Sequence, residues 1–164
     1  MAVACQKMTA RIDFFRESNV VFTTSITVGF RHIDYARIVF YPRYFEMFNE
    51  VVERWFDEAL GCPFAKLHEE WSAGVPLVNS ECQFRRPNHL GDSLDFSLQV
   101  SKLGRGSFTL DIDGSHKGVS CVTARLTMVW VSLGERLQSS PVPIDIRQLM
   151  SAYMIAPDEI EPSK

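Results

Sequence analysis

A single carboxylate, Asp34, lies in a short apolar stretch a few residues before Pro42, where a long helical pattern begins. The first N–H groups of an α-helix have no partner inside the helix and carry a partial positive charge. Pro42 has no N–H, and Tyr41 stands where a capping Ser, Thr, Asp or Asn is expected, which leaves donors at Tyr41, Arg43 and Tyr44. A helix start of this kind can hold an anion or a developing oxyanion.

A carboxylate beside an oxyanion site is the minimal equipment for acyl transfer, because it can serve as the nucleophile or as a base that activates water. The spacing alone leaves a second interpretation open. In that interpretation, Asp34 caps the helix or a local turn through its own side chain, and has no catalytic role.

The elements that position Asp34 are a strand before it and a helix after it. Residues 20–31 alternate between apolar and polar, which predicts a half-buried antiparallel strand with Phe22, Ile26 and Phe30 on one face. Between Pro42 and Leu60, aromatic and aliphatic residues recur at helical spacing, which predicts a long amphipathic helix. So broad an apolar stripe requires a sheet to cover.

The remaining pattern predicts about four more antiparallel strands separated by turns that contain glycine. We therefore expect an α+β domain in which a curved antiparallel sheet of about five strands wraps around a long central helix. The predicted boundaries are an N-terminal extension over residues 1–18, a single domain over 19–150 and a C-terminal tail over 151–164.

Composition excludes several classes of function. The chain has 164 residues and a formal charge of −3, so it has no basic field for nucleic acid or an anionic membrane. The four cysteines and four histidines show no metal-ligand spacing, and we expect neither a metal site nor a cofactor. No secretory leader or membrane span is predicted, which favours the cytoplasm.

Residues 34–44 read D-Y-A-R-I-V-F-Y-P-R-Y. This segment resembles the signature of hot-dog-fold acyl-CoA thioesterases, in the 4-hydroxybenzoyl-CoA thioesterase and YbgC-like branch, which is roughly D-x-A-G-[IV]-V-[YFW]-[YH]-x-x-Y. The likeness spans about residues 22–147 and also includes Arg86-Pro87, Leu90-Gly91-Asp92, Gly104–Phe108 and Pro141–Ile146.

The resemblance implies a hot-dog fold and an acyl-CoA thioesterase in which Asp34 is the catalytic carboxylate. It implies that the Tyr41 backbone N–H polarises the thioester carbonyl, and that CoA enters only as part of the substrate. Subunits of this family pair so that they share active sites, and often double again to a homotetramer. Cations at the mouth of the site meet the CoA phosphates. By position the candidates are Arg105, Lys102, Arg85 and Arg86; solvated strand-end charges are the alternative for the last three.

Arg37 is the plain departure from the family motif, which has glycine at this position. A cation here is predicted to hold Asp34 ionised, to assist substrate binding or to obstruct the site. His32 stands where many members carry an acid, and a structural strand-end histidine is the simpler interpretation. Asn49 and Glu46 lie off the apolar stripe and are predicted either to touch an acyl group across a subunit interface or to be solvated.

Two other functions compete with hydrolysis. A hot-dog protein that only binds acyl-CoA is one, and Arg37 is its best support. A hydratase or dehydratase is the other, but such enzymes need a histidine paired with an acid, and neither His89 nor His116 lies in a matching motif.

Overall fold

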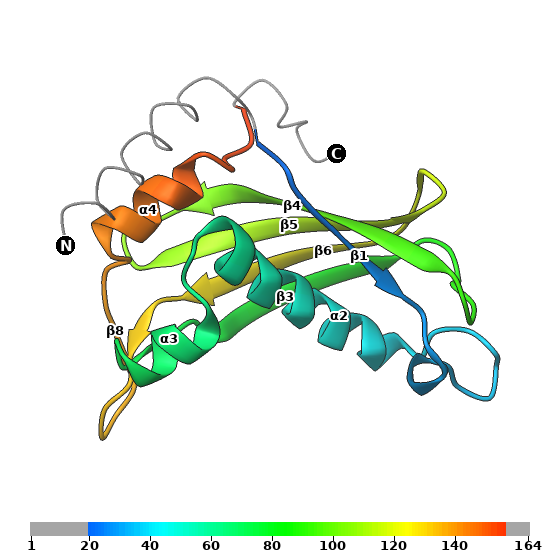
Figure 1. Ribbon diagram of the computed structural model, residues 1–164, viewed down its shortest axis with the longest axis horizontal. Helices are drawn as coiled ribbons and strands as arrows, with labels where there is room; N and C mark the ends of the chain where they lie inside the picture. Colours follow the sequence, from blue (N-terminus) through cyan, green and yellow to red (C-terminus); the bar gives the residue numbers. More distant parts are fainter. Residues whose placement is uncertain (1–19, 157–164) are drawn as a thin grey trace.

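The computed structural model describes residues 20–156 (Figure 1). The helical elements are η1 (Phe30–His32), α2 (Tyr41–Arg54), η2 (Trp55–Ala59), α3 (Phe64–Glu69) and α4 (Ile144–Ser151). The strands are β1 (Phe22–Thr27), β2 (Ala73–Gly74), β3 (Leu77–Phe84), β4 (Ser93–Leu103), β5 (Ser107–His116), β6 (Val119–Val129), β7 (Val131–Ser132) and β8 (Gln138–Ser139).

The main sheet has five antiparallel strands in the order β1-β4-β5-β6-β3, and α2 lies across one of its faces (Figure 1). A small sheet of order β2-β7-β8 lies at the end of the molecule near α3. The expected α+β architecture, with a five-stranded sheet around a long helix, is confirmed. All four pairs of neighbouring strands are antiparallel. Each end of the sheet is therefore formed by the start of one strand and the end of the strand beside it.

The core forms where α2 and η2 press aromatic side chains onto the sheet. Trp55 and Phe56 are fully buried, and the ring of Phe48 meets that of Phe96 on β4 at 6.2 Å. The helix widens into a π-turn at Trp55–Ala59. Gly114 on β5 allows the Phe96 ring to lie close to the backbone of β5, because a Cβ at this position would lie 2.7 Å from that ring.

One sequence-based expectation is wrong. Phe30 does not share the buried face of β1, since it is 82% exposed; β1 ends at Thr27 and the chain turns into η1. The helix α4 runs to Ser151, and the residues after it pack on the sheet. Tyr153 is buried, and its carbonyl accepts a hydrogen bond from Val100 N–H at 2.8 Å. The predicted extension over 1–18 and residues 157–164 of the predicted tail lie outside the described residues.

Candidate active site

Asp34 begins a tight turn between two short paired segments. Its N–H donates to the Ile38 carbonyl at 3.1 Å, and its own carbonyl accepts from Arg37 N–H at 3.0 Å. Oδ1 of its carboxylate accepts the Ala36 N–H at 2.7 Å. Asp34 therefore caps a turn, as one of the two interpretations of the sequence allowed, and it does not cap the helix. The second carboxylate oxygen has no partner among residues 20–156, and the side chain is exposed.

Arg37 closes this turn in the left-handed region, with φ at +64°. This conformation costs a residue with a Cβ roughly 1–2 kcal/mol, whereas glycine adopts it without penalty. The turn thus explains physically why the related motif has glycine at this position. The arginine keeps the same backbone path and adds an exposed cation next to Asp34.

The start of α2 differs by one residue from the prediction. Phe40, with φ −65° and ψ 123°, is the N-cap residue, and Tyr41 is already helical. No side chain caps the helix, as expected. Arg43 N–H is not free, however, because it donates to the Phe40 carbonyl at 2.8 Å. The Tyr41 N–H has no hydrogen-bond acceptor within the described part of the chain.

A groove of about 420 Å³ opens beside this helix start. It is lined by Ile38, Val39, Tyr41, Tyr44, Phe84, Arg85, Arg86 and Pro87. Its walls are mainly aromatic: the Phe84 ring lies 5.5 Å from that of Tyr44 and 6.4 Å from that of Tyr41. Asp34 is on the adjoining turn and is not part of the lining, so one subunit alone leaves the carboxylate open to solvent.

A buried polar pair braces the floor of the groove. The Tyr44 hydroxyl donates to Asn88 Oδ1 at 2.8 Å, and the Asn88 carbonyl accepts from Val39 N–H at 2.9 Å. Both side chains are almost fully buried. Burial raises the pKa of Tyr44 to about 12, so the phenol remains a protonated donor near neutral pH. Asn88 thereby ties α2 and the apolar loop to the connection after β3.

Sequence reasoning missed Asn88, and it assigned Tyr44 only to the apolar stripe. An asparagine in the polar break Arg86-Pro87-Asn88-His89 has no pattern that distinguishes it from a solvated loop residue. The capacity of Tyr44 to donate a hydrogen bond from within the core is the only available signal.

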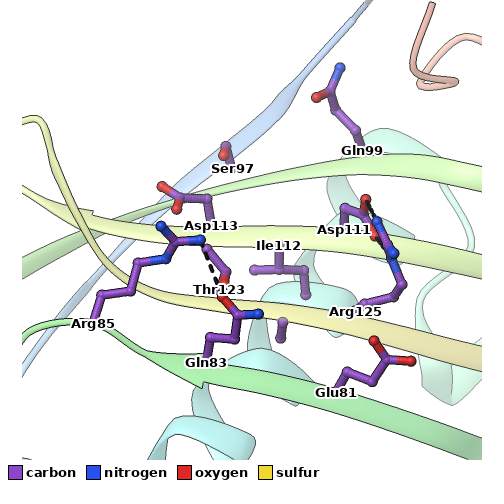
Figure 2. A pocket seen from close by; sticks show the side chains of 11 residues that line it. Glu81, Gln83, Arg85, Ser97, Gln99, Asp111, Ile112, Asp113, Thr123 and Arg125 are labelled. Carbon is purple, nitrogen blue, oxygen red and sulfur yellow. Dashed lines mark hydrogen bonds and ion pairs between the residues drawn. The ribbon is translucent and has the colours of Figure 1, made fainter. Parts of the chain in front are cut away.

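Arg85 and Arg86 lie at the end of β3, where both N–H groups donate to the Cys121 carbonyl, at 2.8 and 3.1 Å. Two residues facing one partner form a bulge, a feature that redirects side chains. The Arg85 guanidinium lies over the outer face of the sheet, where it donates to Gln83 Oε1 at 3.3 Å (Figure 2). Arg86 lies beyond the end of β3, and it lines the groove together with Phe84, whose ring packs on that of Tyr44 in α2.

Lys102 and Arg105 are at the opposite end of the molecule from Asp34. The chain enters β4 near the Asp34 turn and leaves it at Leu103, so these cations are separated from Asp34 by about the length of β4. At ~3.3 Å per residue, its 11 residues extend over roughly 35 Å. A single subunit therefore does not bring Lys102 and Arg105 to Asp34.

Asn49 and Glu46 are exposed on α2. Glu46 forms an ion pair with Arg43 at 2.6 Å. Such a pair on the helix surface is consistent with a solvated face.

His32 is buried and fixed at the base of the Asp34 loop. Its Nδ1 accepts the Gly29 N–H at 3.0 Å, and its carbonyl accepts the Phe40 N–H at 2.9 Å. Burial, reinforced by the nearby positive charge of Arg31, lowers its pKa below 6.5. A neutral imidazole that holds the loop in place agrees with the structural interpretation of this residue.

No group of three or more histidine, cysteine, aspartate or glutamate side chains within residues 20–156 is arranged to hold a metal ion. In that same range, no helix combines the length and the hydropathy that a membrane crossing demands.

The family model of the thioesterase-like superfamily matches residues 28–150. A 1,4-dihydroxy-2-naphthoyl-CoA hydrolase from Synechococcus elongatus is 29% identical over 117 residues, which are 71% of this chain and 85% of the relative. Among solved structures, a gentisyl-coenzyme A thioesterase is 28% identical with a TM-score of 0.71, covering 77% of this chain and 99% of its own. The 4-hydroxybenzoyl-CoA thioesterase of a Pseudomonas species is 24% identical with a TM-score of 0.73, covering 79% of this chain and 98% of its own. The expected hot-dog fold is confirmed.

Proposed function

We propose that this chain hydrolyses the thioester bond of an acyl-CoA. The premise is that the chain belongs to the thioesterase-like superfamily, the family of hot-dog acyl-CoA thioesterases. Water adds to the carbonyl carbon and the C–S bond breaks. One proton of the water passes to the thiolate sulfur, and the products are a carboxylic acid and free CoA.

The observation that carries this proposal is the unpaired Tyr41 N–H at the mouth of an aromatic groove. A backbone N–H that is already oriented toward the carbonyl oxygen stabilises the oxyanion that develops there, because the donor does not have to move during the reaction. Such a donor typically raises the rate by 10²–10³. Asp34 supplies the carboxylate, acting on water as a base or on the carbonyl as a nucleophile. The hydrogen bond from Ala36 N–H to Oδ1 restricts the side chain and leaves the other oxygen available.

A second copy of the chain completes the site. The edge strand β3 has unpaired backbone groups along one side and exposes Leu77, Val78 and Phe84 by 48%, 59% and 51%. An edge of this length and hydrophobicity favours pairing with another strand. Antiparallel pairing of β3 with β3 turns the second copy end for end, which brings its Lys102 and Arg105 toward the first copy's groove and within reach of the CoA phosphates. We expect two such dimers to form a tetramer and to act in the cytoplasm.

The acyl group that we propose for this substrate is aromatic. Two relatives at 29% and 28% identity are named for naphthoyl and gentisyl thioesters, and the groove presents the rings of Tyr41, Tyr44 and Phe84. Offset and edge-to-face ring contacts favour a flat acyl group over a flexible alkyl chain of equal area.

The test compares release of CoA from benzoyl-CoA, a naphthoyl-CoA and hexanoyl-CoA by the wild type and Asp34→Asn. The asparagine Oδ1 can still accept the Ala36 N–H, so the turn is preserved while the charge is lost. We expect faster turnover of the aromatic thioesters and a loss of about 10²–10⁴ in kcat for the variant. Undiminished turnover by a folded Asp34→Asn would refute the assignment. Wild-type protein that binds acyl-CoA without hydrolysing it would identify an acyl-CoA-binding protein.

A further inference from the structure

Arg86 lines a groove whose other residues, apart from Arg85, are aromatic, aliphatic or proline. None of the groove's lining residues is acidic. In the described part of the chain, the ion pairs of arginine are Arg43 with Glu46, Arg54 with Glu50 and Arg125 with Asp111, and none involves Arg86. A guanidinium beside aromatic walls and without a carboxylate partner is suited to an anionic ligand.

The neighbouring Arg85 also lines the groove, but its guanidinium donates to Gln83. Arg85 has the same side chain one residue earlier, but its guanidinium lies on the outer face of the sheet, among Gln83 and acidic residues such as Asp113 (Figure 2). The outer face of the sheet thus carries both acidic and basic side chains, including Arg125 and Asp111, which form a bidentate ion pair at 2.8 Å. The groove has only positive charge.

The size of the groove decides where on a substrate this anion lies. A volume of about 420 Å³ falls in the range of pockets for small molecules. It accommodates an acyl group of one or two rings whose carbonyl meets the Tyr41 N–H. It does not also accommodate the pantetheine arm, which separates the thioester from the CoA diphosphate by more than a dozen bonds. An anion that Arg86 meets inside this groove therefore belongs to the acyl group.

We infer that the groove selects acyl groups that end in a carboxylate, and that Arg86 is the specificity-determining residue that binds this charge. The inference rests on the proposed function for the orientation of the thioester, and goes beyond it by naming the charge of the substrate. Substrates of this class are monothioesters of compact, preferably aromatic, dicarboxylic acids.

The test uses 4-carboxybenzoyl-CoA and 4-methylbenzoyl-CoA, which match in shape and differ in charge. The wild type is expected to show the higher kcat/KM with the carboxylate. Arg86→Ala is expected to lower kcat/KM for that substrate by about 10- to 100-fold, the range for one charge-assisted hydrogen bond, and to change it for the methyl substrate by less than about 2-fold. Arg86→Lys should recover part of the loss, because it restores the charge without the planar fork.

Arg85→Ala is the matched comparison, and it is expected to leave the ratio of the two kcat/KM values unchanged. Equal losses on both substrates in Arg86→Ala would overturn the inference and assign Arg86 to the CoA phosphates. Repeating the assay with the N-acetylcysteamine thioesters of the two acids checks this, because these lack the phosphates: the effect of Arg86→Ala on the carboxylate must persist. No effect on either substrate would also overturn it.

Binding of the corresponding non-hydrolysable thioether analogues of CoA separates this inference from the proposed function. If the wild type releases no CoA, the hydrolase assignment fails, and the dissociation constants still decide about Arg86. Weaker binding of the carboxylate analogue alone to Arg86→Ala supports the inference. Unchanged binding of both analogues, or equally weakened binding, contradicts it. Melting temperatures of all three variants verify that they are folded.

Discussion

The starts of α2 and α4 are alike in sequence and differ in surroundings. Each helix begins beside a proline, Pro42 in α2 and Pro143 in α4, and neither has a side-chain cap. The short helix α3 also begins after a proline, Pro63, without a cap. An uncapped start is therefore common in this chain and is not in itself the mark of a ligand site, since water satisfies exposed N–H groups.

The difference between α2 and α4 lies in what adjoins each start. A hollow of about 410 Å³ also lies near α4, but the Arg147 guanidinium there donates to the carbonyls of Leu103 and Gly104, and Asp145 in the first turn opposes the positive end of the helix. The α2 start has no acidic residue in its first turn and has an aromatic groove and a turn-held carboxylate. The carboxylate and the groove, rather than the missing cap, distinguish the candidate active site.

The largest expected difference between the two helix starts concerns activity. Asp34→Asn is expected to lower kcat by about 10²–10⁴. Asp145→Asn removes another exposed carboxylate, at the α4 start, and should change kcat by less than about 2-fold. Steady-state release of CoA measures both. Similar losses in the two variants would remove the distinction between the helix starts.

The activity of the candidate site at the start of α2 is also expected to depend on a second copy of the chain. Val78→Lys places a charge on the exposed edge strand β3, which disfavours strand pairing. We expect monomers in analytical ultracentrifugation and at least a tenfold loss of kcat/KM at protein concentrations where the wild type is assembled. Val119→Lys, at the 40% exposed start of β6, is the control and should keep the wild-type size. A fully active monomer would refute the shared site.

Tyr44→Phe tests whether the buried hydrogen bond between Tyr44 and Asn88 stabilises the groove beside α2. Removing the hydroxyl leaves Asn88 Oδ1 buried without its donor, at a cost of about 1–3 kcal/mol in the free energy of unfolding. The matched Tyr41→Phe removes a hydroxyl from a ring that is 59% exposed, and its effect on stability should stay within about 0.5 kcal/mol. Chemical denaturation measures both. Equal effects would mean that the buried hydrogen bond does not stabilise the groove.

The smallest expected effect concerns the left-handed residues Arg37 and Lys117, with φ of +64° and +50°. Glycine relieves about 1–2 kcal/mol of backbone strain at either position, but loses about 0.5–1 kcal/mol through the entropy of the unfolded chain. Arg37→Gly and Lys117→Gly should therefore each raise the free energy of unfolding by up to about 1.5 kcal/mol. Lys117 is in the turn between β5 and β6, so only Arg37→Gly is expected to alter KM. A decrease in stability in both variants would contradict the strain argument.

The periodic parts of the fold were predictable because burial on one face imposes a period on the sequence. The alternation around Ile26 and the helical stripe that contains Phe48 and Trp55 led to the correct sheet and central helix. Phe30 was assigned wrongly because alternation continues past Thr27, where the backbone already turns; periodicity does not mark the end of a strand when the next residues happen to alternate.

The candidate site was predictable only where its residues are close together in the sequence. Asp34 and Tyr41 are in one segment, and the motif placed both at the helix start. The hydrogen bond of Asn88 with Tyr44 and the bulge that Arg85 and Arg86 form opposite Cys121 both depend on segments that are distant in the sequence. A bulge reverses or combines the faces of adjacent residues without any signal in residue type. At Arg37 the motif was visible in the sequence, but the reason for its usual glycine was not. The left-handed φ of this position supplies that reason.

A structure with a non-hydrolysable thioether analogue of benzoyl-CoA tests the central claim most directly, because no side-chain replacement can remove the Tyr41 N–H. We predict the analogue's carbonyl oxygen within about 3 Å of the Tyr41 nitrogen, its ring against Phe84 in the groove, and the Asp34 carboxylate facing the carbonyl carbon. A carbonyl oxygen bound elsewhere, with the Tyr41 N–H still facing solvent, would contradict the account.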